Sequence, residues 1–438
     1  MRRRLAAGAL VLLFAPAARA QTYTGYAAAD SAASAQAAAA RSYAARRAGD
    51  LARARDEAAR AAAAWPAQPA YALSWAVSAA RVADTASVLR ALGQYSALGL
   101  GRDTDGDSIF LPYLRTPAFA ATVADLRRNA EPRVNSRIRA TLPDSTFWPE
   151  GLDRDPRTGH FYVTSVRHGA VTSLAPDGTW RELWARGAGP RGAVLAARVD
   201  TARNALWVTL SGVPQMEGYQ PSDSSLGALL RVRLADGVVE RRWNLPVVRG
   251  GHALGDALVS VTGDVFLTDS NEPVLYRLRA GADTLEAIRH PLFRSLQGVT
   301  QGAEDGVLYV ADYSHGLLRV ELGTGAVTRL DDAPNSTSIG CDGIAFDDGA
   351  IIAVQNGVAP ARVMRFVLDA TGRRLVRAEL LDRNSVAADE PTSVIVVGRD
   401  AVYVADSQWE KYDRTGRRVP NTSLRAPVLL AVPLSAAR

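Results

Sequence analysis

The chain has 438 residues, 47% of them hydrophobic and 22% charged, so it is long enough to form two domains with separate cores. Its formal net charge is +6, but the first twenty residues hold four arginines and no acidic residue, so the remainder carries only +2. This weak charge, with no basic run interleaved with aromatic residues, excludes a nucleic-acid partner. The single cysteine, Cys341, excludes an internal disulfide.

The first twenty residues have the pattern of an export signal. Three arginines precede a short apolar run, and Ala18-Arg19-Ala20 forms a small-x-small cleavage site. We therefore expect a signal peptide over residues 1–20, cleaved near Ala20, and a periplasmic or secreted protein. The run is too short for a membrane anchor and no later segment approaches transmembrane length, so no membrane span is expected.

Residues 21–131 are rich in Ala, Arg and Leu and poor in Gly, which favours helix. Two segments repeat, with Asp50 aligned on Asp84: "RAGDLARARDEAARAAAAWP" and "RVADTASVLRALGQYSALGL". The spacing of 34 residues predicts a tetratricopeptide-like α-helical domain, with residues 110–129 as a capping helix. Such a domain either offers a groove to a protein partner or is an appendage that packs or dimerises, and only two repeats favour the appendage.

Residues 132–438 are richer in Gly, Val, Tyr and Thr, in short alternating runs that favour strands. Six related units begin at "PEGLDRDPRTGHFYVTS", "AARVDTARNALWVTLS", "GDALVSVTGDVFLTDS", "LQGVTQGAEDGVLYVADYS", "CDGIAFDDGAIIAVQNG" and "PTSVIVVGRDAVYVADS". The repetition predicts a mainly β fold, a six-bladed β-propeller. We expect residues 135–142 to supply the outer strand of the last blade, which would close the ring and protect its edge.

The first strand of each propeller blade lines the central channel, so residues at the heads of these strands converge. Aligning the units places these residues at the head: Glu150, Asp256, Gln297, Asp342 and Thr392, with Leu195 in the second unit. Carboxylates and an amide facing one another favour a hard cation with oxygen ligands, Ca²⁺ first. The alternative is that these residues only line a hydrated channel.

Three of these segments also carry a family resemblance. Over about residues 145–434, "FWPEGLDRDPRTGHFYVTS", "LQGVTQGAEDGVLYVADYS" and "CDGIAFDDGAIIAVQNG" resemble the gluconolactonase and regucalcin-like (SMP-30-type) propellers. The resemblance implies a divalent metal held by Glu150, Gln297 and Asp342, with Zn²⁺ or Mn²⁺ as alternatives to Ca²⁺. Where the family has a substrate-binding asparagine and arginine, this chain has Gly255 and Ala253.

This resemblance implies a metal-dependent hydrolase of lactones or related esters. The metal would polarise the substrate carbonyl and activate a water molecule, while Asp256 or Asp342 accepts the proton of that water. His252, four residues before Asp256, is a further candidate general base, or else a residue that packs against the rim. The alternative function is a non-catalytic propeller that binds a ligand or, together with the helical repeats, a protein partner.

Overall fold

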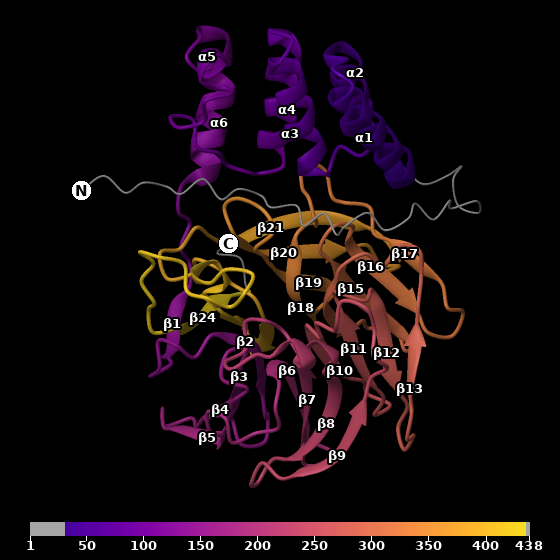
Figure 1. Cartoon of the computed structure of the whole chain (residues 1–438), viewed down its shortest axis with the longest axis vertical. Helices are drawn as coiled ribbons and strands as arrows, with labels where there is room; N and C mark the ends of the chain where they lie inside the picture. Colours follow the sequence, from indigo (N-terminus) through magenta and orange to yellow (C-terminus); the bar gives the residue numbers. More distant parts are fainter. Residues whose placement is uncertain (1–30, 435–438) are drawn as a thin grey trace. The chain divides into compact units, whose positions relative to one another are not determined.

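A computed structural model describes residues 31–434 (Figure 1). The predicted signal peptide lies outside these residues. The chain forms two compact units, a helical one that ends at Glu131 and a β unit that begins at Pro132. Among the helices described, none combines the length and apolar character needed to cross a membrane.

The helical unit contains two helical hairpins followed by a shorter segment. Its elements are α1 Ser31–Arg47, α2 Leu51–Ala64, α3 Pro69–Ala80, α4 Thr85–Ala97, α5 Leu111–Leu114, the 3₁₀ helix η1 Pro117–Phe119, and α6 Ala120–Ala130. Asp50 and Asp84 have the same role, because each caps the second helix of its hairpin. The Asp50 carboxylate accepts from Arg53 N at 3.0 Å, and the Asp84 carboxylate accepts from Ser87 N at 3.1 Å. The repeat in the sequence therefore marks two equivalent helix starts.

The segment after the second hairpin packs on that hairpin. Tyr113 Oη donates to Ala80 O at 3.1 Å, and Asn129 Nδ2 donates to Ser96 O at 2.7 Å and to Leu100 O at 3.1 Å. These bonds add side-chain donors to carbonyl groups at the C-terminal ends of α3 and α4 and in the turn after α4. Residues 110–129, predicted as a capping helix, thus form α5, η1 and most of α6 and pack on this hairpin.

The β unit is a six-bladed β-propeller. In residues 132–434 the strands form six antiparallel sheets of four strands each. Blades 1 to 3 are β2 Pro149–Arg154, β3 Phe161–Ser165, β4 Val171–Leu174, β5 Trp180–Trp184; β6 Ala193–Asp200, β7 Ala205–Ser211, β8 Gly227–Arg233, β9 Val239–Asn244; and β10 Asp256–Val259, β11 Val265–Asp269, β12 Val274–Leu278, β13 Leu285–Ile288. Blades 4 to 6 are β14 Leu296–Gln301, β15 Val307–Asp312, β16 Gly316–Glu321, β17 Val327–Arg329; β18 Cys341–Asp347, β19 Ala350–Gln355, β20 Arg362–Leu368, β21 Leu375–Arg383; and β22 Val394–Val397, β23 Asp400–Val404, β24 Val428–Pro433 with β1 Arg137–Thr141.

The sixth blade closes the ring in the way the sequence predicts. Strand β1 pairs antiparallel with β24, with Ile138 opposite Leu430, so the sheet order is β1-β24-β23-β22. The segment before β1 is held on blade 5, because Asp382 accepts from Asn135 N at 3.1 Å and from Ser136 Oγ at 2.5 Å. One blade is therefore built from residues on both sides of the other five.

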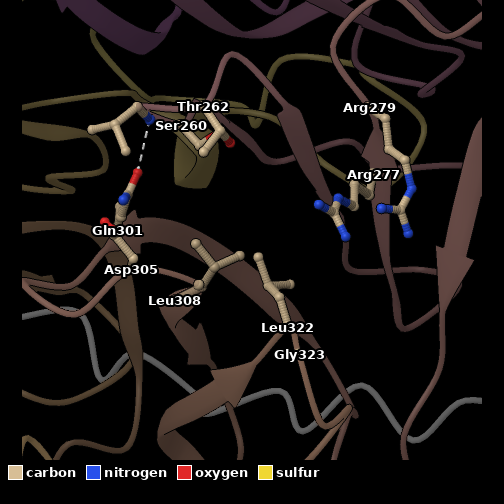
Figure 2. A pocket seen from close by; sticks show the side chains of 11 residues that line it. Ser260, Thr262, Arg277, Arg279, Gln301, Asp305, Leu308, Leu322 and Gly323 are labelled. Carbon is tan, nitrogen blue, oxygen red and sulfur yellow. Dashed lines mark hydrogen bonds between the residues drawn. The ribbon is translucent and has the colours of Figure 1, made fainter.

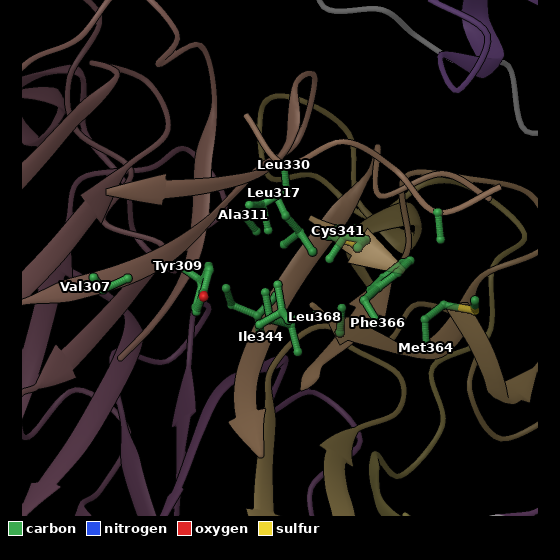
Figure 3. Packing of buried hydrophobic residues seen from close by; sticks show 14 residues of the cluster. Val307, Tyr309, Ala311, Leu317, Leu330, Cys341, Ile344, Met364, Phe366 and Leu368 are labelled. Carbon is green, nitrogen blue, oxygen red and sulfur yellow. The ribbon is translucent and has the colours of Figure 1, made fainter. Parts of the chain in front are cut away.

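Neighbouring blades pack face to face through apolar layers. Between blades 4 and 5, Tyr309 and Leu317 pack with Ile344 and Phe366, and Cys341 lies in the same buried cluster (Figure 3). The thiol of Cys341 therefore belongs to the packing between blades, as expected for a residue that alternates with a channel-facing neighbour. This packing fixes the position of each first strand about the channel.

Candidate active site on the propeller axis

The heads of the first strands carry a repeated β-bulge. In β2 the register leaves Glu150 and Gly151 together opposite one residue of β3. The same kind of bulge occurs at three other strand heads, where the two residues on the bulged strand are Leu195–Ala196, Gln297–Gly298 and Asp342–Gly343. A bulge turns a side chain away from the ordinary alternation of a strand. The head residue and the small residue after it are thus one structural unit.

The glycine of this unit is required by the neighbouring blade. A Cβ atom on Gly298 would lie 2.5 Å from Asp342 O, and one on Gly343 would lie 2.5 Å from Thr392 O. A Cβ atom on Gly151 would lie 2.7 Å from Leu195 O. In these three blades the head therefore packs directly against the head of the next blade, at a distance that leaves no room for a Cβ atom.

The predicted equivalence of Asp256 with these heads is wrong by one residue. The amide of Asp256 donates to Thr268 Oγ1 at 3.1 Å, and the amide of Gly151 donates to the equivalent threonine of β3 at 2.8 Å. Asp256 therefore matches Gly151, and Gly255 matches Glu150. In blade 3 the acidic residue follows the glycine instead of preceding it. An alignment that places acidic residues on acidic residues is therefore displaced by one position in this blade. We call the six true heads the axial ring: Glu150, Leu195, Gly255, Gln297, Asp342 and Thr392.

Two carboxyl groups of the axial ring, Glu150 and Asp342, are largely buried. Burial and the nearby charge of Asp342 raise the pKa of Glu150 well above its ordinary value, although Trp409 Nε1 donates to Glu150 Oε2 at 2.9 Å. Burial also raises the pKa of Asp342 to about 6, although Asn356 Nδ2 donates to Asp342 Oδ2 at 2.7 Å. Neither carboxyl forms an ion pair with an arginine or lysine of residues 31–434. Such a pair is stable near neutral pH only if it retains a proton or receives a cation.

Two amide side chains lie beside these carboxyl groups with unused oxygen atoms. Gln297 Nε2 donates to Ser295 Oγ at 3.3 Å, while its Oε1 lies 3.4 Å from where a Cβ atom on Gly255 would be. Asn356, directly after β19, donates through Nδ2 to Asp342 and to Pro391 O at 2.9 Å. Its Oδ1 is buried and accepts no hydrogen bond within the described chain. A buried acceptor without a donor is uncommon and indicates a missing partner.

These four side chains are suited to a hard cation, because each offers oxygen. Within residues 31–434, no group of three or more His, Cys, Asp and Glu side chains is placed to hold a metal ion. A metal ion at the axial ring would therefore need amide oxygen atoms in addition to the carboxylates of Glu150 and Asp342. Gln297 and Asn356 are the residues that can supply them.

Asp256 belongs to a separate ionic group further along the first strands. Arg198 of β6 donates from Nη2 to Asp256 Oδ1 at 2.6 Å, from Nε to Ala257 O at 2.7 Å, and from Nη1 to Leu152 O at 2.6 Å. The other carboxylate oxygen of Asp256 accepts from Val299 N at 3.0 Å. One guanidinium group thus joins the first strands of blades 1, 2 and 3, and both oxygen atoms of Asp256 are already bonded.

His252 is not placed with the channel carboxyl groups. Its ring is fully buried, with Nδ1 2.5 Å from Asp269 Oδ2 and Nε2 donating to Pro246 O at 2.8 Å. Burial lowers the pKa of His252, but the bonds to Asp269 and Pro246 outweigh it and raise the pKa overall. Both ring nitrogen atoms of His252 are therefore engaged within the protein, by Asp269 and by Pro246.

Aromatic side chains lie next to Glu150. Trp148 stacks on Tyr412 with ring centroids 4.3 Å apart and meets Trp409 edge to face at 4.9 Å. Trp409 belongs to the 3₁₀ helix η3 (Trp409–Lys411), and Tyr412 follows it in the long connection between β23 and β24. The insertion between β7 and β8, which contains the 3₁₀ helix η2 (Pro221–Ser225), adds Met216 to the same cluster. Two connections thus place an apolar wall beside the acidic groups.

Two cavities of the propeller lie away from the axial ring. One of about 310 Å³ lies between blades 3 and 4, where Gln301 Oε1 accepts from Val261 N at 3.0 Å and Arg277 and Arg279 lie side by side (Figure 2). A second, of about 650 Å³, lies between blades 1 and 2 and includes His160. Residues of the axial ring line neither cavity. Arg277 and Arg279 are already paired, with Asp264 and Glu286.

Three polar residues at the channel are missing from the sequence prediction. Arg198 lies three residues after its strand head, in the unit that matches the others least well. Asn356 and Tyr313 each follow the second strand of a blade, directly after the small polar position in "AVQNG" and "VADYS". Aligning the ends of the second strands, as well as the starts of the first, would have singled out both.

The chain matches no protein-family model, and no curated protein matches it. Solved structures similar to it include a gluconolactonase from Xanthomonas campestris, with 16% identity, coverage of 69% of this chain and 96% of that chain, and a TM-score of 0.45. A calcium-binding regucalcin from Agrobacterium tumefaciens has 14% identity, coverage of 68% and 95%, and a TM-score of 0.47. Virginiamycin B lyase from Staphylococcus aureus has 15% identity, coverage of 62% and 82%, and a TM-score of 0.44. These solved structures include both kinds of propeller that the sequence resembles.

Proposed function

We propose that the axial ring is the active site of a metal-dependent hydrolase of lactones or related esters. The observation that carries this proposal is the meeting of two unpaired, largely buried carboxyl groups with the orphaned Oδ1 of Asn356. Internal hydrogen bonds leave both carboxyl pKa values raised, and a divalent cation would satisfy all three groups together. With the predicted signal peptide, the enzyme would act in the periplasm or outside the cell.

The metal ligands would be Glu150, Gln297 and Asp342, as the sequence suggests, together with Asn356. Their all-oxygen chemistry favours Ca²⁺ over Zn²⁺, while Mn²⁺ also accepts such a set. When bound, the ion would polarise the substrate carbonyl and lower the pKa of a water molecule. Asp342 is the member of the predicted catalytic set that lies in the axial ring, and its carboxyl would take up the proton released by the attacking water.

The other two candidate bases have different roles in this proposal. Both oxygen atoms of Asp256 are bonded, to Arg198 and to backbone amides, so Asp256 would stabilise the channel. His252 would hold the loop before β10 through Asp269. This leaves Asp342 as the proton acceptor.

The direct test is elemental analysis of purified protein, followed by the isosteric variants Glu150→Gln and Asp342→Asn. We expect near-stoichiometric divalent metal in the native protein, its loss in both variants, and hydrolysis of lactones that a chelator abolishes. Asp269→Asn is a matched control, because it changes a buried carboxylate away from the axial ring. Metal without turnover would favour the alternative of a ligand-binding or partner-binding propeller. Absence of metal after incubation with Ca²⁺, Mn²⁺ and Zn²⁺ would refute the hydrolase mechanism.

A further inference from the structure

Tyr313 is a channel-side residue with an unusual environment. It directly follows β15, and its backbone is held at two strand heads, since its N–H donates to Ser295 O at 2.8 Å and its carbonyl accepts from Gly340 N at 2.9 Å. Its phenol ring extends from blade 4 to Gly357 of blade 5. A Cβ atom on Gly357 would lie 2.7 Å from Tyr313 Cζ and 2.9 Å from Cε1, so only glycine leaves room for the ring.

The hydroxyl of Tyr313 has no hydrogen-bond partner among residues 31–434. Tyrosine hydroxyls in largely buried positions normally have a partner. Burial, followed by the charges of Asp342 and Glu390, raises the pKa of Tyr313. The phenol therefore lies within electrostatic reach of the axial-ring carboxyl Asp342. Its hydroxyl is free to donate a hydrogen bond to a bound group.

The charges around this donor limit what it can meet. Glu150 and Asp342 have no arginine or lysine partner in the described chain, and a divalent ion would only balance these two carboxylates. Glu390 adds a third carboxyl, but burial raises its pKa to about 8, so it is mostly protonated at neutral pH. Beyond the ion itself, no arginine or lysine is paired with the carboxyl groups of the axial ring, so an anionic group would gain no further positive partner there.

We propose that Tyr313 is a substrate-binding residue whose hydroxyl donates a hydrogen bond to an oxygen atom of an uncharged lactone or ester at the axial ring. This inference deepens the proposed function and rests on it for the substrate class. Tyr313 thus supplies the polar contact that Gly255 and Ala253 cannot make.

The test uses a matched pair of non-hydrolysable lactams, 2-pyrrolidinone and pyroglutamate, which differ by one carboxylate. Ligand-observed NMR titrations of the full, Ca²⁺-loaded protein would measure binding to the native chain, Tyr313→Phe and Tyr309→Phe. Tyr309 is the control, because it lies in the same blade and its hydroxyl donates to Gly372 O at 2.9 Å. We expect native protein to prefer 2-pyrrolidinone, Tyr313→Phe to bind it about tenfold more weakly with unchanged metal content, and Tyr309→Phe to bind it normally.

Each contrary result has a distinct meaning. Three results would overturn the role of Tyr313. Tyr313→Phe could bind 2-pyrrolidinone as tightly as native protein does, Tyr313→Phe could lose its metal, or native protein could bind neither lactam. Tighter binding of pyroglutamate would overturn the uncharged class. If native protein binds 2-pyrrolidinone through Tyr313 but hydrolyses no lactone, the hydrolase proposal fails while the binding role stands. If Tyr313→Phe does not fold, Tyr313→Leu also removes the hydroxyl and should weaken binding in the same way.

Discussion

Replacing Arg198 by alanine should strongly destabilise the propeller. The side chains of Arg198 and Asp256 are only 11% and 9% exposed, so solvent screens their interaction weakly. The substitution removes the charged bond to Asp256 and leaves Leu152 O and Ala257 O without a donor. Removing one partner of a buried ion pair typically costs about 3–5 kcal/mol, because the other charge stays buried and uncompensated. For a unit of this size we expect the melting temperature to fall by roughly 2 °C per kcal/mol, or about 6–10 °C in total.

The assay is urea unfolding at neutral pH of native protein, Arg198→Ala, Asp256→Asn and the double variant. The double variant should be more stable than Arg198→Ala, because the uncompensated charge is gone. In Arg198→Ala the folded-state pKa of Asp256, already above 3.8, should rise further. A raised carboxyl pKa favours the folded state at low pH, so the variant should regain stability as the pH falls towards 3.8. A loss below about 1 kcal/mol, or no rescue by Asp256→Asn, would refute this account.

Three further outcomes follow from the channel geometry. Gly298→Ala should lower the free energy of unfolding by about 1–3 kcal/mol in urea titrations, because its Cβ atom would meet Asp342 O at 2.5 Å, and an unchanged midpoint would contradict the packing of heads. Without metal, the raised pKa values of Glu150 and Asp342 (about 6 for Asp342) should make the melting temperature fall as the pH rises through 6, and added Ca²⁺ should reverse the fall. His252 has a raised pKa, so its stabilising effect should be full below 6.5 and decline above it. The stability difference between native protein and His252→Asn should therefore shrink at alkaline pH, and a constant difference would argue against the Asp269 pair.

The blades and their closure could be predicted because they depend on local signals. The second strands lie between two neighbouring blades and are buried along most of their length, which produces the repeated apolar runs, such as "FYVTS" and "VLYVAD". Residues 137–141 form a strand that belongs to none of the six sequence units. Strand β24 has a free edge, and residues 137–141 pair with it.

The channel was harder to predict because its contacts join different blades. In Glu150–Gly151 and Gln297–Gly298 the polar residue precedes the glycine, whereas in Gly255–Asp256 the order is reversed. An alignment by residue type could not detect the resulting shift of one position. The role of Arg198 was not predicted either. Its partners Asp256 and Leu152 belong to two other blades, and the position of one blade relative to another is set only when the ring is closed.

The closing strand also determines when the propeller can be completed during synthesis. Residues 137–141 leave the ribosome almost three hundred residues before β24, their only partner in the sheet, because Ile138 pairs with Leu430. Long-range pairing of this kind slows folding, since the entropy of the intervening chain must be lost first. Five blades can assemble in order of synthesis, but the sixth must wait for the last strand. Until then β1 is an unpaired strand that another chain could capture, so a chaperone that shields residues 137–141 should increase the yield of folded protein.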